Sequence, residues 1–510
     1  MRSKGYARPG VVHGVALAHR RNPWRPVIAL VAALSVLTAA LPVSATATST
    51  PQIHLLEQEV VPDRPFTAAA DADAPNGPIP IPKIIRSRVY HTYYDMTTEL
   101  QDLAAAHPDI AKLSSLGKSI GGRDLWVMRI TNFATLDAGN GTADNGSEGG
   151  RWTAYIDGGH HGNEQLGMEL AILMIHYLLD DYGGDPLATR FVDAYDIWVT
   201  PMVNPDGNVK DNRENNNNID LNRNYDFEWT DESNHGSGPF SEPESRANGA
   251  GMAALDFDFY LSYHTGVDEI LLPWAYTTDL APDDQMYVTV GGILTNLTGI
   301  PAVRTGSGLY VATGSSMDYA YGALGAPAST IEVDSTQWRW LTAQAVEDRL
   351  SEEFEASVWF LEHIAELRAR LSVSAWSLSG GSGRDLHLSL DVENLGYGTP
   401  NGTTVTVGST TGVRIVDVEG NATIPAKGTS VLNMTLVTSH TGRVPLEINI
   451  TYRELQVNSS RNVTTLLTLE LVIPQGSAVI IGGLPLAIAV LIASVVAVVL
   501  LVLRRRSRRL

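Results

Sequence analysis

Residues 89–371 consist of short apolar segments that alternate with helical segments, and this alternation limits the possible folds more than any other feature. Apolar runs bounded by turn residues are typical of buried strands, and they lie at 124–131, 151–159, 194–204, 257–265 and 326–334. Helical periodicity is found at 96–108, 169–182 and 343–371. Strands that are apolar on both sides need helices on both faces of their sheet. The sequence therefore predicts an α/β domain with a mixed, mostly parallel sheet covered on both faces.

From residue 372 to 473 the pattern changes to short segments rich in Thr and Val, separated by Gly, Asn and Pro. Apolar and polar residues alternate in these segments, and a two-residue period is typical of strands with one buried face. About 100 residues of this kind predict a β-sandwich-like module. We expect this module to act as a spacer or an adhesive element.

Residues 1–47 are typical of a secretory signal peptide. Six Lys and Arg residues in the first 25 positions precede an apolar run at 26–42, and small residues suited to cleavage follow at Ala45 and Ala47. An uncleaved membrane anchor is the alternative, although the apolar run is short for a span. Residues 48–88 are then expected to form a Pro-rich linker.

Residues 478–503 carry no charge and are long enough to cross a bilayer as one transmembrane helix. Five arginines follow within residues 504–510, and positive charge next to a span stays on the cytoplasmic side. We therefore expect a single-pass protein of the cell membrane with an extracellular main body and a basic cytoplasmic tail. The alternative for this segment is a buried core helix.

The charge of the main body argues against a nucleic acid partner. The chain has 36 Lys and Arg residues against 56 Asp and Glu residues. The terminal segments 1–25 and 504–510 contain basic residues but no acidic ones, so the main body is more acidic than the whole chain. A surface that binds nucleic acid needs a basic footprint, which this acidic body does not supply.

The chain has no cysteine, so packing or a metal has to replace disulfides. Six Asn-x-Ser/Thr motifs between Asn401 and Asn462 predict a glycosylated module, and a β surface rich in Thr and Asn is the alternative.

The segment GGHHGNEQLG at 158–167 contains one of three His-x-x-Glu pairs in the chain. The three pairs are His54/Glu57, His161/Glu164 and His363/Glu366. The first lies in the linker, and the third lies on the charged face of the expected closing helix. The pair at 161 and 164 follows a buried strand and precedes a helix, and sites in α/β sheets gather at the carboxyl ends of strands. We therefore select this pair as a candidate site.

His264 lies at the end of a second buried strand and completes a possible metal site. Two histidines and one glutamate, here His161, His264 and Glu164, are a typical catalytic zinc set that leaves a fourth position open for water. The alternative for His264 is a core histidine with hydrogen-bond partners. His160 follows the Gly-Gly turn directly, so we expect it to point elsewhere, with a supporting role beside the metal as the alternative.

Several motifs in this part of the chain occur in the order of a known enzyme family. The segment 90–130 looks like the family's first helix and strand, HGNE (161–164) takes the place of its first metal motif, and NPDG (204–207) is its next landmark. DLNRNY (220–225) matches its Asn-Arg-Asn signature, and SYHT (262–265) is similar to the strand with its last metal ligand. YVATGSSMDYAY (310–321) leads to STIEV (329–333) with the family's spacing. Residues 89–371 thus resemble the funnelin zinc carboxypeptidases, the family of carboxypeptidase A.

The resemblance implies peptide hydrolysis by a zinc-activated water, with one Zn²⁺ per catalytic domain held by His161, Glu164 and His264. It assigns Glu332 the role of general base. The alternative for Glu332, a lone buried carboxylate in an apolar strand, would be costly without a partner.

The resemblance also implies a binding site for the substrate. Asn222 and Arg223 should hold the terminal carboxylate, because an arginine fork matches a carboxylate with two hydrogen bonds. The alternative is a polar surface loop. Tyr310 should close over the bound end of the peptide. Met317 falls where the family places the floor of the pocket for the last side chain, and it implies an apolar preference.

The oxyanion-stabilising arginine is where the chain departs from the family pattern. The family usually places this arginine in an Arg-Lys-Asn segment after NPDG. The loop here is shorter, and Arg213 keeps the pattern Arg-x-Asn, so we choose Arg213, with Lys210 as the alternative. Short loops of this kind also occur in murein-peptide amidases of the same family.

These observations predict a cell-surface zinc metallocarboxypeptidase that hydrolyses the C-terminal bond of peptides or proteins. One alternative is a murein-peptide amidase with the same fold. The other is a non-catalytic surface protein that binds peptides or adheres, although the complete ligand set and Glu332 argue against an inert domain.

Overall fold

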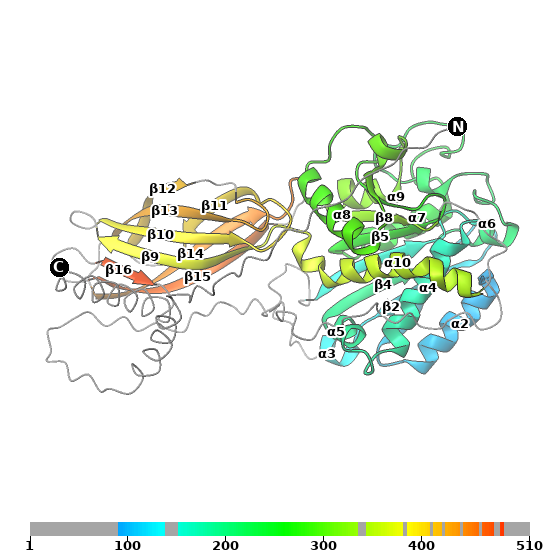
Figure 1. Cartoon of the computed structure of the whole chain (residues 1–510), viewed down its shortest axis with the longest axis horizontal. Helices are drawn as coiled ribbons and strands as arrows, with labels where there is room; N and C mark the ends of the chain where they lie inside the picture. Colours follow the sequence, from blue (N-terminus) through cyan, green and yellow to red (C-terminus); the bar gives the residue numbers. More distant parts are fainter. Residues whose placement is uncertain are drawn as a thin grey trace, which may run out of the picture. The chain divides into compact units, whose positions relative to one another are not determined.

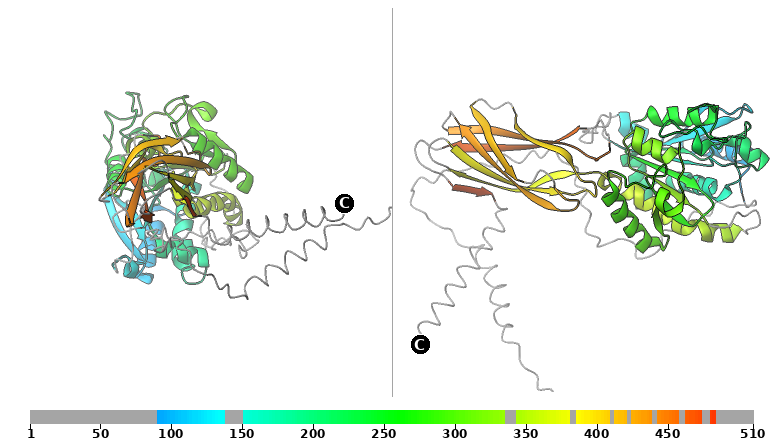
Figure 2. Two further views of the ribbon diagram at one scale, coloured as in Figure 1. Left: turned by 90° about the vertical axis from the view of Figure 1, so that its left-hand side faces the viewer. Right: turned by 90° about the horizontal axis from the view of Figure 1, so that it is seen from above.

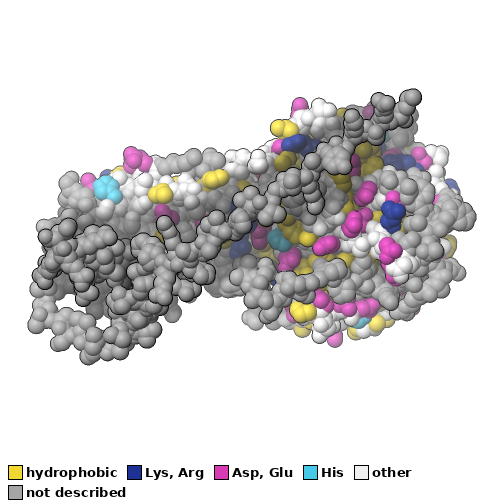
Figure 3. Space-filling view, viewed as in Figure 1, with side chains coloured by type: hydrophobic (Ala, Val, Ile, Leu, Met, Phe, Trp, Pro, Cys, Tyr) yellow, Lys and Arg dark blue, Asp and Glu magenta, His cyan; other side chains and the backbone are white. Residues whose placement is uncertain are grey.

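The structure is a computed structural model that describes residues 90–137, 151–334, 343–380, 385–408, 412–420, 424–438, 442–457, 462–473 and 480–483 (Figure 1). An α/β part ends at residue 366, and strands alone follow from residue 371. Acidic side chains are spread over the visible face of the α/β part (Figure 3), as the net charge of −20 suggests.

The α/β part contains an eight-stranded mixed sheet in the order β1-β2-β4-β3-β5-β8-β6-β7. Its strands are β1 (Ala111–Lys118), β2 (Asp124–Ile130), β3 (Trp152–Gly158), β4 (Tyr195–Thr200), β5 (Phe259–His264), β6 (Glu269–Leu272), β7 (Ala302–Arg304) and β8 (Ala328–Glu332). The central strands β4, β3, β5 and β8 are parallel to their neighbours within this group, and β1, β2 and β6 each pair antiparallel with a neighbour. The mixed sheet agrees with the prediction.

Helices cover both faces of this sheet (Figures 1 and 2). The α-helices are α2 (Tyr93–Ala106), α3 (Phe133–Asp137), α4 (Gln165–Asp180), α5 (Pro186–Ala194), α6 (Pro205–Lys210), α7 (Pro243–Ala253), α8 (Asp284–Thr298), α9 (Ser316–Asp318) and α10 (Ala343–Glu362). Short 3-10 or π turns occur at η1 (Leu221–Arg223), η2 (Thr305–Leu309), η3 (Tyr319–Ala323) and η4 (Ile364–Glu366).

The alternation of side chains along β5 shows how the two faces are filled. Phe259 stacks on Phe360 of α10 with ring centroids 4.6 Å apart. The next residue, Tyr260, points to the opposite face, where its hydroxyl donates to Asp157. Asn248 of α7 donates to the same carboxylate. Because neighbouring side chains of a strand point to opposite faces, α10 and α7 lie on opposite sides of the sheet.

The strands that follow residue 370 form two antiparallel sheets (Figure 2). One has the order β12-β13-β10-β9-β16 and the other β11-β14-β15. The strands are β9 (Leu371–Gly380), β10 (Asp385–Asn394), β11 (Asn401–Val407), β12 (Val413–Gly420), β13 (Thr429–Thr438), β14 (Gly442–Arg453), β15 (Asn462–Ile473) and β16 (Ile480–Gly483). Leu388 and Leu436 of the first sheet and Ile448 of the second belong to one hydrophobic cluster, so the two sheets share a core.

Three expectations differ from the structure or lie outside it. The closing helix ends at Glu362 rather than at 371, because a 3-10 turn and then β9 follow. The expected signal peptide and linker lie outside the described residues. Most of the expected membrane helix also lies outside the described residues. Its residues Ile480–Gly483 are described, and they form a strand beside β9 instead of a helix. This agrees with the strand preference of β-branched isoleucine. None of the helices in the described part of the chain has the length and apolar character needed to cross a bilayer.

Candidate active site

The candidate site lies at the carboxyl ends of three neighbouring parallel strands. The strand β3 ends at Gly158 just before His161, while β5 ends at His264 and β8 at Glu332. The strands pair in the order β3-β5-β8, and His264 is the register partner of Glu332. The three side chains therefore reach the same edge of the sheet, which is where sites of open α/β sheets are found.

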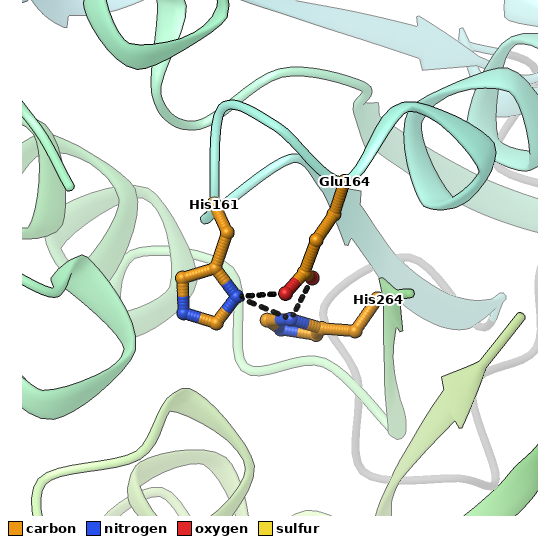
Figure 4. Close-up of side chains that lie close together, drawn as sticks. All are labelled: His161, Glu164 and His264. Carbon is orange, nitrogen blue, oxygen red and sulfur yellow. Dashed lines mark hydrogen bonds and ion pairs between the residues drawn. The ribbon is translucent and has the colours of Figure 1, made fainter. Parts of the chain in front are cut away.

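His161, Glu164 and His264 converge to form a buried ligand set (Figure 4). The Nδ1 atom of His161 lies 2.7 Å from Oε1 of Glu164, and Nδ1 of His264 lies 2.9 Å from Oε2 of the same carboxylate. The two Nδ1 atoms are 3.2 Å apart. Two imidazole nitrogens and one carboxylate oxygen within 4.8 Å of one another fit a zinc ion with an open fourth position. Among the described residues, no other group of three possible ligands meets this distance.

Two glycines allow the chain to place this ligand set. Gly159 has a φ of +65°, a left-handed conformation that turns the chain out of β3 toward His161. Gly167 lies in the first turn of α4, and a Cβ atom there would come within 2.8 Å of the backbone of Tyr263. Its small size therefore allows α4, and with it Glu164, to approach β5 closely.

Asp220 orients the first histidine of the set. It is 2 % exposed, and its Oδ1 lies 2.9 Å from Nε2 of His161. A proton on Nε2 that is donated to Asp220 leaves Nδ1 free to bind a metal. Burial alone would raise the pKa of Asp220, but His161 and two nearby arginines hold this pKa well below its usual range. The role of Asp220 was not predicted from the sequence, although its place two residues before Asn222 in DLNRNY was a usable signal.

Glu332 lines the same cavity as the three ligands. Burial and the neighbouring Glu164 raise the pKa of Glu332 to about 7. Glu164 differs, because His161 and His264 outweigh the effect of its burial and lower the pKa of Glu164 below its usual range. The two carboxyl groups of this cavity thus have different pKa values, as expected for a metal ligand and a group that transfers protons.

Arg213 lines this cavity, whereas Lys210 is exposed at the end of α6 and does not. Nε and Nη2 of Arg213 donate to Oδ2 of Asp220 over 3.1 and 2.9 Å, and Nη1 donates to Glu164 over 3.0 Å. The guanidinium group is therefore held beside the ligand set by two carboxylates. Of the two cations considered from the sequence, only Arg213 lies beside the ligand set.

Asn222, Arg223 and Tyr310 lie together at another part of the cavity lining. The side-chain oxygen of Asn222 accepts from the backbone nitrogen of Ser316 over 2.8 Å, which orients its amide nitrogen toward His264. Nη2 of Arg223 is 3.5 Å from the hydroxyl of Tyr310. Tyr310 is 49 % exposed, so its ring has room to move over a bound molecule.

The remaining lining of the cavity carries no charged side chain among the described residues. Apolar and hydroxyl-bearing side chains form it, including Leu271, Ala275, Thr305, Leu309, Ala312, Met317 and Thr330. Met317 is 3 % exposed and follows the helix cap at Ser315. This wall can receive an uncharged side chain of moderate size.

Of the other two His-x-x-Glu pairs, His54/Glu57 lies outside the described residues, and His363/Glu366 does not line this site. His363 stacks on Trp359 with ring centroids 4.1 Å apart, and its Nδ1 donates to the Trp359 carbonyl. His363 is therefore a packed histidine at the end of α10.

Comparison with known proteins identifies similar sequences over the same region. Residues 96–356 match the family described as Peptidase_M14, zinc carboxypeptidase. Carboxypeptidase SOL1 of Arabidopsis thaliana is 28% identical over 276 residues, which cover 51% of this chain and 53% of the relative. A zinc carboxypeptidase of Saccharothrix mutabilis subsp. capreolus is 28% identical over 270 residues, covering 46% of this chain and 59% of the relative. The chain thus spans little more than half the length of these relatives. The crystal structure of carboxypeptidase A from Helicoverpa armigera aligns with a TM-score of 0.45 and 22% identity, over 54% of this chain and 72% of that structure.

Proposed function

This chain belongs to the zinc carboxypeptidase family, and from that premise we propose that it removes C-terminal residues from peptides by hydrolysis. One observation carries the proposal. A single cavity contains the ligand set of His161, Glu164 and His264, the carboxyl group of Glu332 and the carboxylate-binding pair Asn222 and Arg223. A site that binds a terminal carboxylate next to a hydrolytic centre selects the last peptide bond of a chain.

The residues of the cavity divide the chemistry between them. A zinc ion bound to the ligand set would polarise the scissile carbonyl and make a water molecule more acidic. Glu332 accepts a proton from the attacking water and passes it to the leaving amine, which its pKa of about 7 allows near neutral pH. The guanidinium of Arg213 donates to the oxygen on which negative charge develops. To do so, Arg213 exchanges one of its present carboxylate partners for the substrate.

The other polar residues position the substrate. Arg223 pairs with the terminal carboxylate through its planar fork, and the amide nitrogen of Asn222 donates a further hydrogen bond. The exposed ring of Tyr310 closes over the bound end. Met317 contacts the last side chain, so we propose a preference for uncharged, mainly apolar, C-terminal residues.

The proposal is tested by incubating the purified full-length chain with a set of peptides, with and without a zinc chelator. We expect release of single C-terminal amino acids, loss of release with the chelator, and recovery after zinc is added back. Matched peptides with an amidated C-terminus should resist cleavage, because they lack the carboxylate that Arg223 binds. Equal cleavage of the amidated peptides would contradict exopeptidase action, and cleavage of murein-type peptides alone would support the amidase alternative.

We further propose that the chain is exported and held at the cell membrane by the apolar residues 484–503, which follow strand β16, with the zinc carboxypeptidase part outside and a glycosylated β module between them. The apolar terminal segments, the arginines at 504–510 and the Asn-x-Ser/Thr motifs of the sequence support this proposal. Protease treatment of intact cells should remove the α/β part while leaving a cytoplasmic C-terminal tag intact. Protection of the α/β part in intact cells would place it on the other side of the membrane.

A further inference from the structure

His160 is a buried histidine beside the ligand set. Its side chain is 0 % exposed, and its Nε2 lies 2.8 Å from the hydroxyl of Tyr225. Its ring is nearly parallel to the ring of His264, with an interplanar angle of 13° and centroids 5.3 Å apart. This distance is typical of offset-stacked rings. His160 therefore covers one face of a metal ligand without entering the ligand set itself.

The two histidine ligands differ in what holds their outer nitrogens. Nε2 of His161 lies 2.9 Å from the carboxylate of Asp220, which accepts its proton. Nε2 of His264 faces the amide nitrogen of Asn222 at 3.2 Å. An amide nitrogen is only a donor, so it cannot accept the proton that a histidine carries when its Nδ1 binds a metal. The orientation of His264 therefore depends more on packing than that of His161 does.

The hydrogen bonds around His160 bear on which of its ring nitrogens carries the proton. The side-chain oxygen of Asn248 accepts from Tyr155, so its amide nitrogen is the donor to the hydroxyl oxygen of Tyr225. The proton of Tyr225 is then available for Nε2 of His160, which can accept it when the imidazole proton is on Nδ1. That atom is 3.7 Å from Oδ1 of Asp157.

A hydrogen bond holds the His160 ring in place. The hydroxyl of Tyr225, which Asn248 holds in place, fixes the plane of that ring.

We propose that His160 is a positioning residue, which, with Tyr225 behind it, holds the imidazole of His264 in the orientation that binds zinc. The inference rests on the proposed zinc site. It predicts that disturbing His160 or Tyr225 weakens zinc binding, while the three ligands stay in place. Loss of a contact behind a metal ligand typically lowers affinity by about 10-fold to 100-fold.

The test compares zinc dissociation constants of full-length variants, measured by competition with a chelator. Tyr225→Phe removes the hydroxyl that orients His160 and keeps the ring volume. Tyr177→Phe is the matched control, because Tyr177 is as buried as Tyr225 and its hydroxyl, near the C-terminal end of α4, donates to Asp185, the N-cap residue of α5. We expect Tyr225→Phe to weaken zinc binding about 10-fold or more. The control should lower the stability of the zinc-free protein to a similar degree without changing zinc affinity.

A double-mutant cycle shows whether Tyr225 acts through His160. In a His160→Ala background, Tyr225→Phe should weaken zinc binding by much less than it does in the natural sequence. Wild-type zinc affinity in both single variants would overturn the inference. It would also be overturned if the losses of zinc affinity in the two single variants simply added in the double variant. If His160→Ala does not fold, the comparison of Tyr225→Phe with Tyr177→Phe decides. Failure of the unaltered chain to bind zinc would instead overturn the proposed function.

Discussion

Glu332 is the register partner of His264, since the two residues end the adjacent parallel strands β8 and β5. A metal ligand and a titratable carboxyl group are thus placed side by side by backbone pairing alone. A shift of one residue in this register would turn one of the two side chains to the other face of the sheet. Strand pairing therefore controls the distance on which the proposed chemistry depends.

Replacing Glu332 should remove turnover and keep the metal. Glu332→Gln preserves size but cannot accept a proton, and general acid–base catalysis typically contributes a factor of about 10²–10⁴. We expect kcat to fall by at least about 10² with an unchanged zinc content. Steady-state kinetics and metal analysis of the same preparation check this prediction. Normal turnover by Glu332→Gln would exclude Glu332 from the mechanism.

Arg213 should affect kcat more than KM. Removing one donor to a developing oxyanion typically lowers kcat by about 10²–10³, and Arg213→Gln removes the guanidinium. Lys210→Gln is the companion variant, because Lys210 is exposed and lies outside the cavity lining. Kinetics of both variants with one peptide substrate decide between the two cations. A loss with Lys210→Gln alone would transfer the role to Lys210.

Met317 should influence which C-terminal residue is released. Met317→Asp introduces a negative charge into an otherwise uncharged wall, so peptides ending in Lys or Arg should become better substrates. We expect the ratio of kcat/KM for a C-terminal Lys over a C-terminal Leu to rise about 10-fold or more. Met317→Leu keeps the wall apolar and serves as the control. An unchanged ratio in Met317→Asp would place the specificity determinant elsewhere in the cavity.

Zinc should stabilise the folded chain. A ligand that binds only the folded state adds a free energy that grows with concentration, about 4 kcal/mol at a thousand times Kd. The melting temperature should therefore rise with added zinc and fall with a chelator. His264→Gln removes a ligand and should abolish most of this zinc-dependent shift. A shift of equal size in His264→Gln would indicate that zinc binds at another site.

A second cluster of histidines and carboxylates, outside the lining of the cavity, predicts a pH dependence of stability. His91 lies 2.8 Å from Glu169 of α4 and 2.6 Å from Glu99 of α2, and Glu99 also contacts His176. Burial would lower the pKa of His91, but these hydrogen bonds outweigh it and raise the pKa to about 10.

The sign of this effect follows from linkage. The pKa of His91 is higher in the folded state than in the unfolded chain, so its contribution is fully present below about pH 6.5. The contribution is lost as the pH rises toward about 10. His91→Asn should therefore destabilise the protein at pH 7 much more than at pH 10.5, as measured by urea unfolding. An equal destabilisation at both pH values would show that His91 is not protonated in this cluster.

Much of the α/β part could be predicted from local sequence patterns. The runs around Ala154, Ile197 and Leu261 are apolar on both faces, and only a buried strand accounts for such short runs between turns and helices. The ends of the elements were predicted less accurately, as the closing helix shows. Its end depends on where β9 begins to pair with β10, and no helical pattern records that pairing.

The sequence by itself identified the strands β2, β3, β4, β5 and β8, but not β1, β6 or β7. It also showed that His161, His264 and Glu332 lie at or just beyond the carboxyl ends of three of them. Parallel strands present those ends at one edge, so a shared site was predictable. Only the tertiary structure decided that β3, β5 and β8 are neighbours, that Asp220 holds His161, and that His160 packs against His264. The reason is physical: local periodicity records which face of an element is buried, whereas strand order and side-chain partners depend on contacts between distant parts of the chain.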